Sequence, residues 1–157
     1  MRRIFVALAG LALVAGACNG DPEPVDEPVE EAVDDYDVSQ QPTDAAASFV
    51  TPSDGDTVGA PVQVGMAAEG VDIVPADAPV VGEGHFHINV DIGCVDEGEV
   101  VPGPSEEATE EGYLHFGDGS TEAELDLEPG TYELCLQLAD GVHRAFGETH
   151  TITVTVE

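Results

Sequence analysis

Short runs of alternating apolar and polar residues, separated by turn residues, are the feature that most constrains this fold. The closing run "HTITVTVE" places Ile152, Val154 and Val156 on one side and threonines on the other. A period of two is typical of a β-strand that turns one face to a core. Comparable runs, bounded by Gly, Pro, Asp or Ser, occupy 48–52, 60–70, 82–94, 113–120, 121–130 and 131–141. No window has a helical period, so we expect an all-β, immunoglobulin-like antiparallel β-sandwich.

The first residues, "MRRIFVALAGLALVAGAC", have the form of a secretory signal peptide: two arginines, an apolar run and small residues. The apolar run is too short for a membrane-spanning helix. Its end, Val14 to Cys18, resembles a bacterial lipobox, which implies cleavage before Cys18 and lipidation of its sulfur. We therefore expect a signal peptide over 1–17 and an exported lipoprotein, anchored to the membrane on the periplasmic or cell-surface side. Plain secretory cleavage near Ala17, which would leave a free Cys18, is the alternative.

The segment 18–46 is dominated by Pro, Asp and Glu and has almost no aromatic residues. Such a segment cannot bury enough apolar surface to offset its chain entropy. We therefore expect a disordered acidic tether. The remaining residues, 47–157, are enough for one modest core, and we assign the sandwich to them.

The chain carries a formal net charge of −30 and contains no lysine. Arg144 is the one basic side chain beyond the expected signal peptide. Nucleic acid is thereby excluded as a partner, because few groups remain to neutralise phosphates. Anionic lipid headgroups are repelled, so membrane attachment depends on the lipid at Cys18. The acidity fits either solvation in a saline habitat or low-affinity collection of cations, and it indicates no particular protein partner.

Two cysteines lie within the expected sandwich, Cys94 and Cys135. An even pair in an exported domain most often forms a disulfide, and metal coordination is the alternative. Parity raises a difficulty, because Cys94 continues the core-facing side of its run whereas Cys135 lies opposite Leu134 and Leu136. A bulge at Gly93, or a bridge at the end of the strand, would resolve it.

The run "GHFHINVDIGC", 84–94, has an unusual polar side. Phe86, Ile88, Val90 and Ile92 share the side that we expect to face the core, and the other side carries His85, His87, Asn89 and Asp91. We expect that second side to face solvent. Two imidazoles on one face of a strand lie roughly 6–7 Å apart, so both can reach one ion.

Two further histidines lie beside turns, His115 in "YLHFGDG" and His143 in "ADGVHRAFG". Neutral imidazoles that converge from separate strands suit copper or zinc. We expect nitrogens of His85, His87 and His115 to lie within about 4 Å of one point, given metal–nitrogen bonds of about 2 Å. The alternative is a scattered or merely structural set of histidines.

Other side chains have secondary roles in this hypothesis. Asp91 and Asp140 are candidates to orient a ring through its second nitrogen. The fifth histidine, His150, shares its side with Ile152 and is the weakest candidate ligand.

The segments "GHFHINVD", "HFGDGSTEAELDLEPGTYELCLQLADGVH" and "TITVTV" resemble an exported bacterial family known as domain of unknown function 4399. The resemblance covers most of 48–157. Phe86 stands where the family has a middle histidine, and a second histidine expected near Phe146 is absent. These two departures imply that any site here has fewer imidazoles than the family pattern. The resemblance implies no established activity. The matching positions are Gly84, His85, His87, Asp91, His115, Phe116, Gly117, Thr121, Glu122, Leu127, Pro129, Gly130, Ala139, Asp140 and His143.

The run "GHFHINVDIGC" is also similar to the metal-binding strand of copper–zinc superoxide dismutases, which combine an immunoglobulin-like sandwich, two such histidines and a disulfide. Their bridging histidine and zinc loop cannot be placed in this sequence. Those enzymes also need an arginine near the metal, and Arg144, next to His143, is the one arginine available beyond the expected signal peptide. We therefore expect a non-catalytic domain that binds copper or zinc through His85, His87, His115 and His143. A structural or interaction module without metal is the alternative, and superoxide-dismutase-like activity is a minor one.

Overall fold

Strands dominate residues 36–157, which are the part of the chain that this computed structural model describes. The signal peptide expected at 1–17, Cys18 and the tether up to 35 lie outside the described residues. Within 36–157, no helix combines the length and the apolar character needed to cross a membrane. The elements are η1 Val38–Gln40, β1 Ala46–Thr51, β2 Thr57–Val58, β3 Val62–Glu69, β4 Asp72–Ile73, β5 Glu83–Val90, α1 Glu106–Glu110, β6 Tyr113–Phe116, β7 Glu122–Leu125, β8 Gly130–Ala139 and β9 Ala145–Val156.

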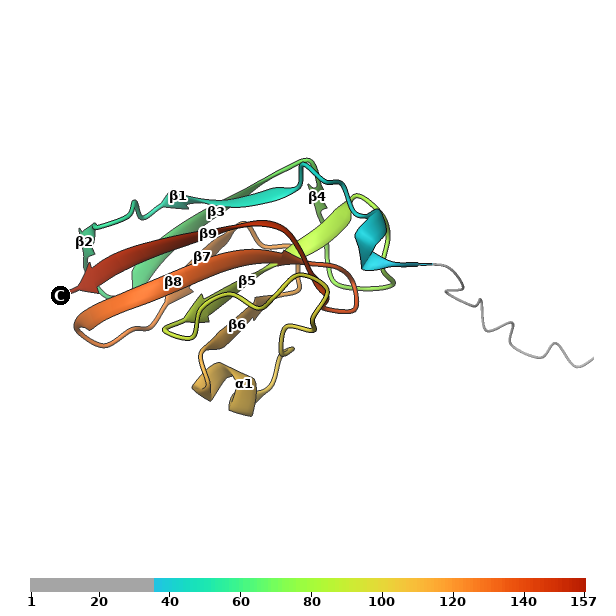
Figure 1. Ribbon diagram of the computed structural model, residues 1–157. Helices are drawn as coiled ribbons and strands as arrows, with labels where there is room; N and C mark the ends of the chain where they lie inside the picture. Colours follow the sequence, from blue (N-terminus) through green and yellow to red (C-terminus); the bar gives the residue numbers. More distant parts are fainter. Residues whose placement is uncertain (1–35) are drawn as a thin grey trace, which may run out of the picture. The chain divides into compact units, whose positions relative to one another are not determined.

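The strands form two layers that β9 connects (Figure 1). One layer contains β1, β3 and β7 in antiparallel order. The other contains β5, β8 and β9, also antiparallel, with β6 and β4 on the free edge of β5 and β2 beside β9. Glu148 in β9 pairs with Ala46 in β1, so β9 belongs to both layers. The expected immunoglobulin-like β-sandwich is confirmed.

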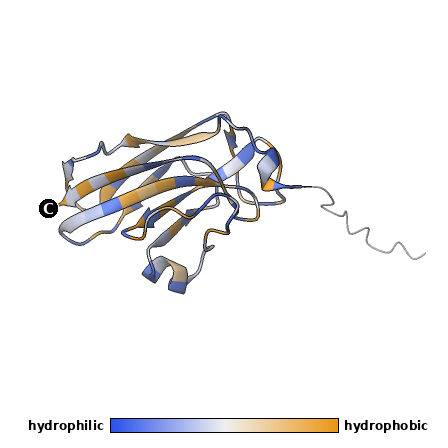
Figure 2. Cartoon of the chain, viewed as in Figure 1, coloured by the Kyte–Doolittle hydropathy of each residue, from blue (hydrophilic) through white to orange (hydrophobic). Residues whose placement is uncertain are grey.

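The core lies between the two layers and follows the predicted alternation. Phe86 and Ile88 of β5 have no exposed surface, and Ile152 and Val154 of β9 are at most 1% exposed. Apolar and polar residues alternate toward the end of β9, whereas the middle of β8 is continuously apolar (Figure 2). Burial stabilises each such side chain by roughly 1.5–3 kcal/mol relative to exposure. The predicted apolar side of β9, Ile152, Val154 and Val156, is confirmed as core, and Leu134, Leu136 and Leu138 of β8 lie in the same core.

The end of the expected tether packs against the sandwich. Gln41 is 6% exposed, and its side-chain amide donates hydrogen bonds to the carbonyl oxygens of Val80 and Glu83. The expectation of disorder is therefore wrong for 36–46. Composition misled because polar hydrogen bonds to distant residues, rather than apolar burial, hold this segment.

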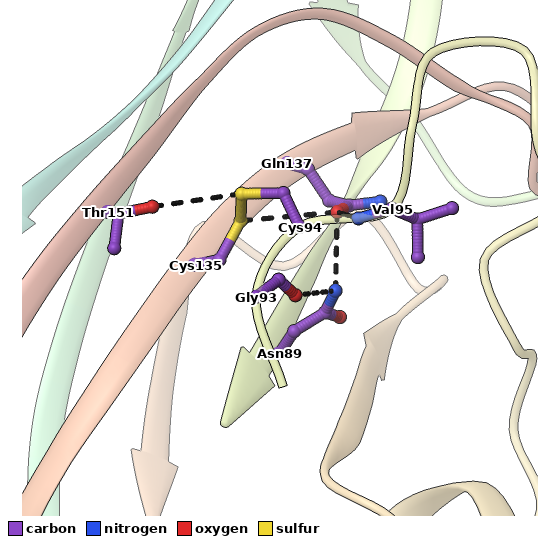
Figure 3. Close-up of a disulfide and its surroundings, with 7 residues drawn as sticks. All are labelled: Asn89, Gly93, Cys94, Val95, Cys135, Gln137 and Thr151. Carbon is purple, nitrogen blue, oxygen red and sulfur yellow. Dashed lines mark hydrogen bonds between the residues drawn. A yellow bond between two sulfur atoms is a disulfide. The ribbon is translucent and has the colours of Figure 1, made fainter. Parts of the chain in front are cut away.

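A disulfide joins Cys94 to Cys135 and attaches the loop after β5 to β8 (Figure 3). The strand ends at Val90, and the left-handed conformations of Asp91 (φ 60°) and Gly93 (φ 72°) turn the chain across the sheet. This turn resolves the parity difficulty, because it brings Cys94 to the face that Cys135 occupies. The metal-ligand alternative for the cysteines is wrong.

The same loop covers the face of β5 and β8 that is opposite to the core. The Val95 amide donates to Gln137 Oε1 at 2.8 Å, and Asn89 Nδ2 donates to the Gly93 carbonyl oxygen at 2.8 Å (Figure 3). Val101 is fully buried there, in a second small apolar cluster with Ala139 and Ala145. The expectation that this face is solvated is therefore wrong, since periodicity states which residues share a face but not what covers it.

Candidate metal centre

Four histidine rings meet on the covered face of the sheet. One ring nitrogen from each of His85, His87, His115 and His143 lies within 4.8 Å of the other three. The Nε2 atoms of His85 and His87 are 3.0 Å apart, and those of His115 and His143 are 3.1 Å apart. The predicted convergence of His85, His87 and His115 is confirmed, and His143 completes the cluster.

Strand register explains why these residues meet. His85 and His87 share one face of β5 because they are two residues apart. In the β5–β6 pair, His87 lies directly opposite His115. In the β5–β8 pair, His85 lies opposite Ala139, the last residue of β8. The turn between β8 and β9, which carries His143, therefore begins beside His85.

Asp140 shapes that turn. This carboxylate has no exposed surface, and its Oδ1 accepts hydrogen bonds from the Val142 and Arg144 amides, both at 2.9 Å. The His143 amide donates to the Asp140 carbonyl oxygen at 2.9 Å. His143 has a φ of 66°, a left-handed conformation that costs a non-glycine residue roughly 1–2 kcal/mol. The hydrogen bonds of Asp140 hold the turn in spite of that strain.

The expectation that Asp91 or Asp140 orients an imidazole ring directly is wrong. Asp91 Oδ1 accepts from the Glu133 amide at 2.8 Å, beside the turn that ends β5. Asp140 acts on the backbone of the His143 turn rather than on its ring. Among the described residues, Nδ1 of His85 and Nδ1 of His87 have no hydrogen-bond partner at all.

The rings pack closely, and one glycine makes room for them. Centroids of the six ring pairs are separated by 4.9 to 5.6 Å. A Cβ atom at Gly117 would overlap Cε1 and Nε2 of His115, so the ring occupies space that another residue type would fill. Gly103, in the covering loop, lies against the His143 ring with space for an ordinary contact. Gly117 is thus a residue that the His115 position requires.

Burial keeps His85 and His87 uncharged. His85 and His87 have no exposed surface, and burial lowers the pKa of His85 to about 3 and that of His87 to about 2, with repulsion from neighbouring imidazoles adding to both. Burial also lowers the pKa of half-buried His115, and electrostatic repulsion between the His115 and His143 rings adds to that effect. Neutral imidazole is the form that offers a lone pair to a metal.

The four nitrogens fit a transition-metal ion. Tetrahedral coordination with bonds of 2.0–2.1 Å places ligand nitrogens about 3.3–3.4 Å apart. The separations of 3.0 and 3.1 Å within the pairs, and the overall span of 4.8 Å, lie on either side of this spacing. An all-imidazole ligand set suits zinc or copper.

His150 and Arg144 lie outside this cluster. Nδ1 of His150 accepts a hydrogen bond from the Phe49 amide at 3.0 Å, and its ring packs on Phe49, so it links β9 to β1. The Arg144 guanidinium donates to the Gly98 carbonyl oxygen at 3.1 Å and helps to fix the covering loop. Both side chains therefore connect segments of the fold, and neither belongs to the histidine cluster.

Sequence reasoning missed Tyr36 and Gln137. Gln137 lies opposite His87 and is fully buried, and its parity with Cys135 could have placed it on this face. Tyr36 donates a hydrogen bond from its hydroxyl to Asp140 Oδ2 at 2.7 Å. No local pattern could have indicated this contact, because 104 residues separate the two partners.

The fold and the site define an immunoglobulin-like β-sandwich domain with a cluster of four histidines, two of them fully buried and two half-buried. The chain belongs to the family described as Domain of unknown function (DUF4399), whose model matches residues 64–157. All four histidines lie within the matched range. No curated protein matches this chain.

Three solved chains match this one. One comes from work on Clostridium thermocellum CbhA fibronectin(III)-like modules, with 12% sequence identity and a TM-score of 0.39. The match covers 74% of this chain and 48% of that chain, so this chain spans about half the length of that protein. A likeness this distant supports no statement about function.

Proposed function

We propose that this domain binds one copper or zinc ion through His85, His87, His115 and His143, without catalysing a reaction. The observation that carries the proposal is the convergence of four ring nitrogens within 4.8 Å on a face that is otherwise buried. Catalytic zinc sites usually have three protein ligands and one open position, whereas non-catalytic, structural zinc sites usually have four protein ligands. The geometry therefore favours a binding domain.

The ion would be held outside the cytoplasm, by a protein anchored through a lipid on Cys18. Support comes from the lipobox-like sequence before Cys18 and from the Cys94–Cys135 disulfide, since disulfides persist in oxidising compartments. The acidic surface would add weak, diffuse attraction for cations, which salt screens.

Calorimetric titration of the full chain with Zn(II) and with Cu(II), after chelator treatment and at high salt, tests the proposal. The test variants are His85→Ala/His87→Ala, in the buried half of the cluster, and His115→Ala, in its half-buried half. The matched control is His150→Ala, which removes an imidazole outside the cluster. Circular dichroism checks that each variant folds.

One ion per chain is expected for the wild type and for His150→Ala. Binding should be lost in His85→Ala/His87→Ala and weakened in His115→Ala. Weak, salt-sensitive binding of equal strength in all four proteins would refute the histidine site and leave only diffuse attraction to carboxylates.

An interaction module without metal is the second candidate, and one surface favours it. A groove between α1, β6 and β7 has an apolar floor and an acidic margin. It is lined by Val90, Leu114, Leu125 and Leu127, with Glu110, Glu111, Glu124 and Asp126 beside them. Superoxide-dismutase-like activity gains no comparable support, because the four nitrogens converge on a single point.

A further inference from the structure

Residues 36–41, which we call the N-terminal strap, contact the turn that carries His143 and the turn that precedes β5. Tyr36 and Gln41 are the two side chains involved. Tyr36 reaches the turn that carries His143, and Gln41 reaches the turn that precedes β5 and His85. The strap thus joins two segments that are far apart in the sequence.

The contact to the His143 turn goes through the buried carboxylate of Asp140. Two backbone amides of the turn donate to Oδ1, and the Tyr36 hydroxyl donates to Oδ2 at 2.7 Å. A carboxylate without exposed surface needs such donors, since unpaired buried charge is strongly unfavourable. Burial, together with the bond to Asp140, raises the pKa of Tyr36 to about 12, so the hydroxyl keeps its proton at neutral pH.

The contact to β5 goes through the side-chain amide of Gln41. Its Oε1 accepts from the Gly82 amide at 2.9 Å, and its Nε2 lies 3.2 Å from the Val80 carbonyl oxygen and 3.3 Å from that of Glu83. The same Nε2 donates to the Tyr36 hydroxyl at 3.0 Å. Gln41 is 6% exposed, so these bonds are shielded from water.

We propose that Tyr36 is a positioning residue for the metal site and sets its affinity by holding the His143 turn against the start of β5. The inference rests on the proposed function. A continuous series of hydrogen bonds leads from Glu83, two residues before His85, through Gln41 and Tyr36 to Asp140. Replacing residues that orient metal ligands commonly changes metal affinity by about 10–100-fold. Tyr36 orients His143 indirectly, through the Asp140 carboxylate that holds its turn.

The test compares Tyr36→Phe with Tyr132→Phe in the full chain. Each variant removes one hydroxyl, and Tyr132 donates to the Glu128 carbonyl oxygen at 2.9 Å, in the turn before β8 and away from the histidines. The measurements are the Zn(II) dissociation constant and the visible absorption of the Co(II)-substituted protein, which reports the ligand geometry. We expect Tyr36→Phe to weaken Zn(II) binding about 10-fold or more and to alter the Co(II) spectrum, whereas Tyr132→Phe matches the wild type.

Hydrogen exchange of the metal-free chain adds a readout that needs no ion. The Val142 and Arg144 amides, which donate to Asp140, should exchange faster in Tyr36→Phe than in the wild type and in Tyr132→Phe. Unchanged exchange, or Zn(II) affinity equal to that of Tyr132→Phe, would overturn the role of the strap while the proposed function stands. A wild-type chain that binds no Zn(II), Cu(II) or Co(II) would overturn the proposed function, and this inference with it.

Discussion

Acid should destabilise the metal-free protein through His85 and His87. Burial lowers the pKa of these two side chains to about 3 and about 2 in the folded protein. In the unfolded chain both take up a proton near pH 6.5, the ordinary value for histidine. Because the unfolded state then binds more protons, the free energy of unfolding falls as the pH falls below about 6.5. Above about pH 6.5 the free energy of unfolding is not reduced by these two histidines. The reduction grows as the pH falls from about 6.5 toward the folded pKa values.

The size of the effect follows from the depressed pKa values. Each pH unit below the unfolded pKa removes about 1.4 kcal/mol for each histidine that stays neutral in the folded state. Between about pH 7.5 and about pH 5.5, the two residues together remove about 3 kcal/mol. The lowered pKa of His115 acts in the same direction. Protonation of carboxylates relieves repulsion and acts in the opposite direction, so high salt is needed to screen it.

Urea unfolding at these two pH values, in chelator and high salt, measures the effect. The comparison is with His85→Leu/His87→Leu, which fills the two buried positions with apolar side chains and removes both titrating groups. The wild type should lose about 3 kcal/mol more than the variant on going to the lower pH. If the two proteins lose stability in parallel, the reasoning that both imidazoles are buried and neutral is wrong.

Three further outcomes test other parts of the structure. Zinc at 100 times its dissociation constant should raise the free energy of unfolding by about 2.7 kcal/mol; a similar gain in His115→Ala at the same zinc concentration would contradict the site. Reduction of the Cys94–Cys135 disulfide, whose partners are 41 residues apart, should lower the free energy of unfolding by about 4 kcal/mol, and an unchanged urea midpoint would argue against this role. Gly117→Ala should weaken zinc binding, because the added Cβ would overlap the His115 ring. The control Gly59→Ala has open space around the added Cβ and should bind zinc as the wild type does. Equal affinities of the two variants in a calorimetric titration would contradict the close packing of Gly117 on His115.

The sandwich and its core could be predicted from local pattern. Alternation in "HTITVTVE" and "TYELCLQLADG" identified the inward residues of β8 and β9, since a strand necessarily points successive side chains to opposite faces. The four histidines could also be nominated from the sequence, because such residues are conspicuous in a chain with a single arginine beyond residue 3 and no lysine. Neither pattern required knowledge of which strands are neighbours.

Other features depended on contacts between distant residues. The face that carries His85 and His87 was expected to be solvated, but the loop attached by Cys94 and Cys135 covers it. The segment before 46 was expected to be disordered, but Tyr36 donates to Asp140, 104 residues away. Composition and periodicity describe a segment by itself, so they cannot report a hydrogen-bond partner supplied from elsewhere in the chain.

The sequence by itself determined the longer strands, their inward residues and the set of imidazoles available to a metal, but not the two-residue strands β2 and β4. These follow from the period of two and from the residue types, which are local properties. The tertiary structure decided that the imidazoles converge, because the register places His87 opposite His115 and the β8–β9 turn brings His143 beside His85. It also decided that His85 and His87 are buried and neutral, since the pKa of an imidazole depends on the groups that displace water from it. Register and burial are properties of strand pairs and packed layers, and no single segment of the chain contains them.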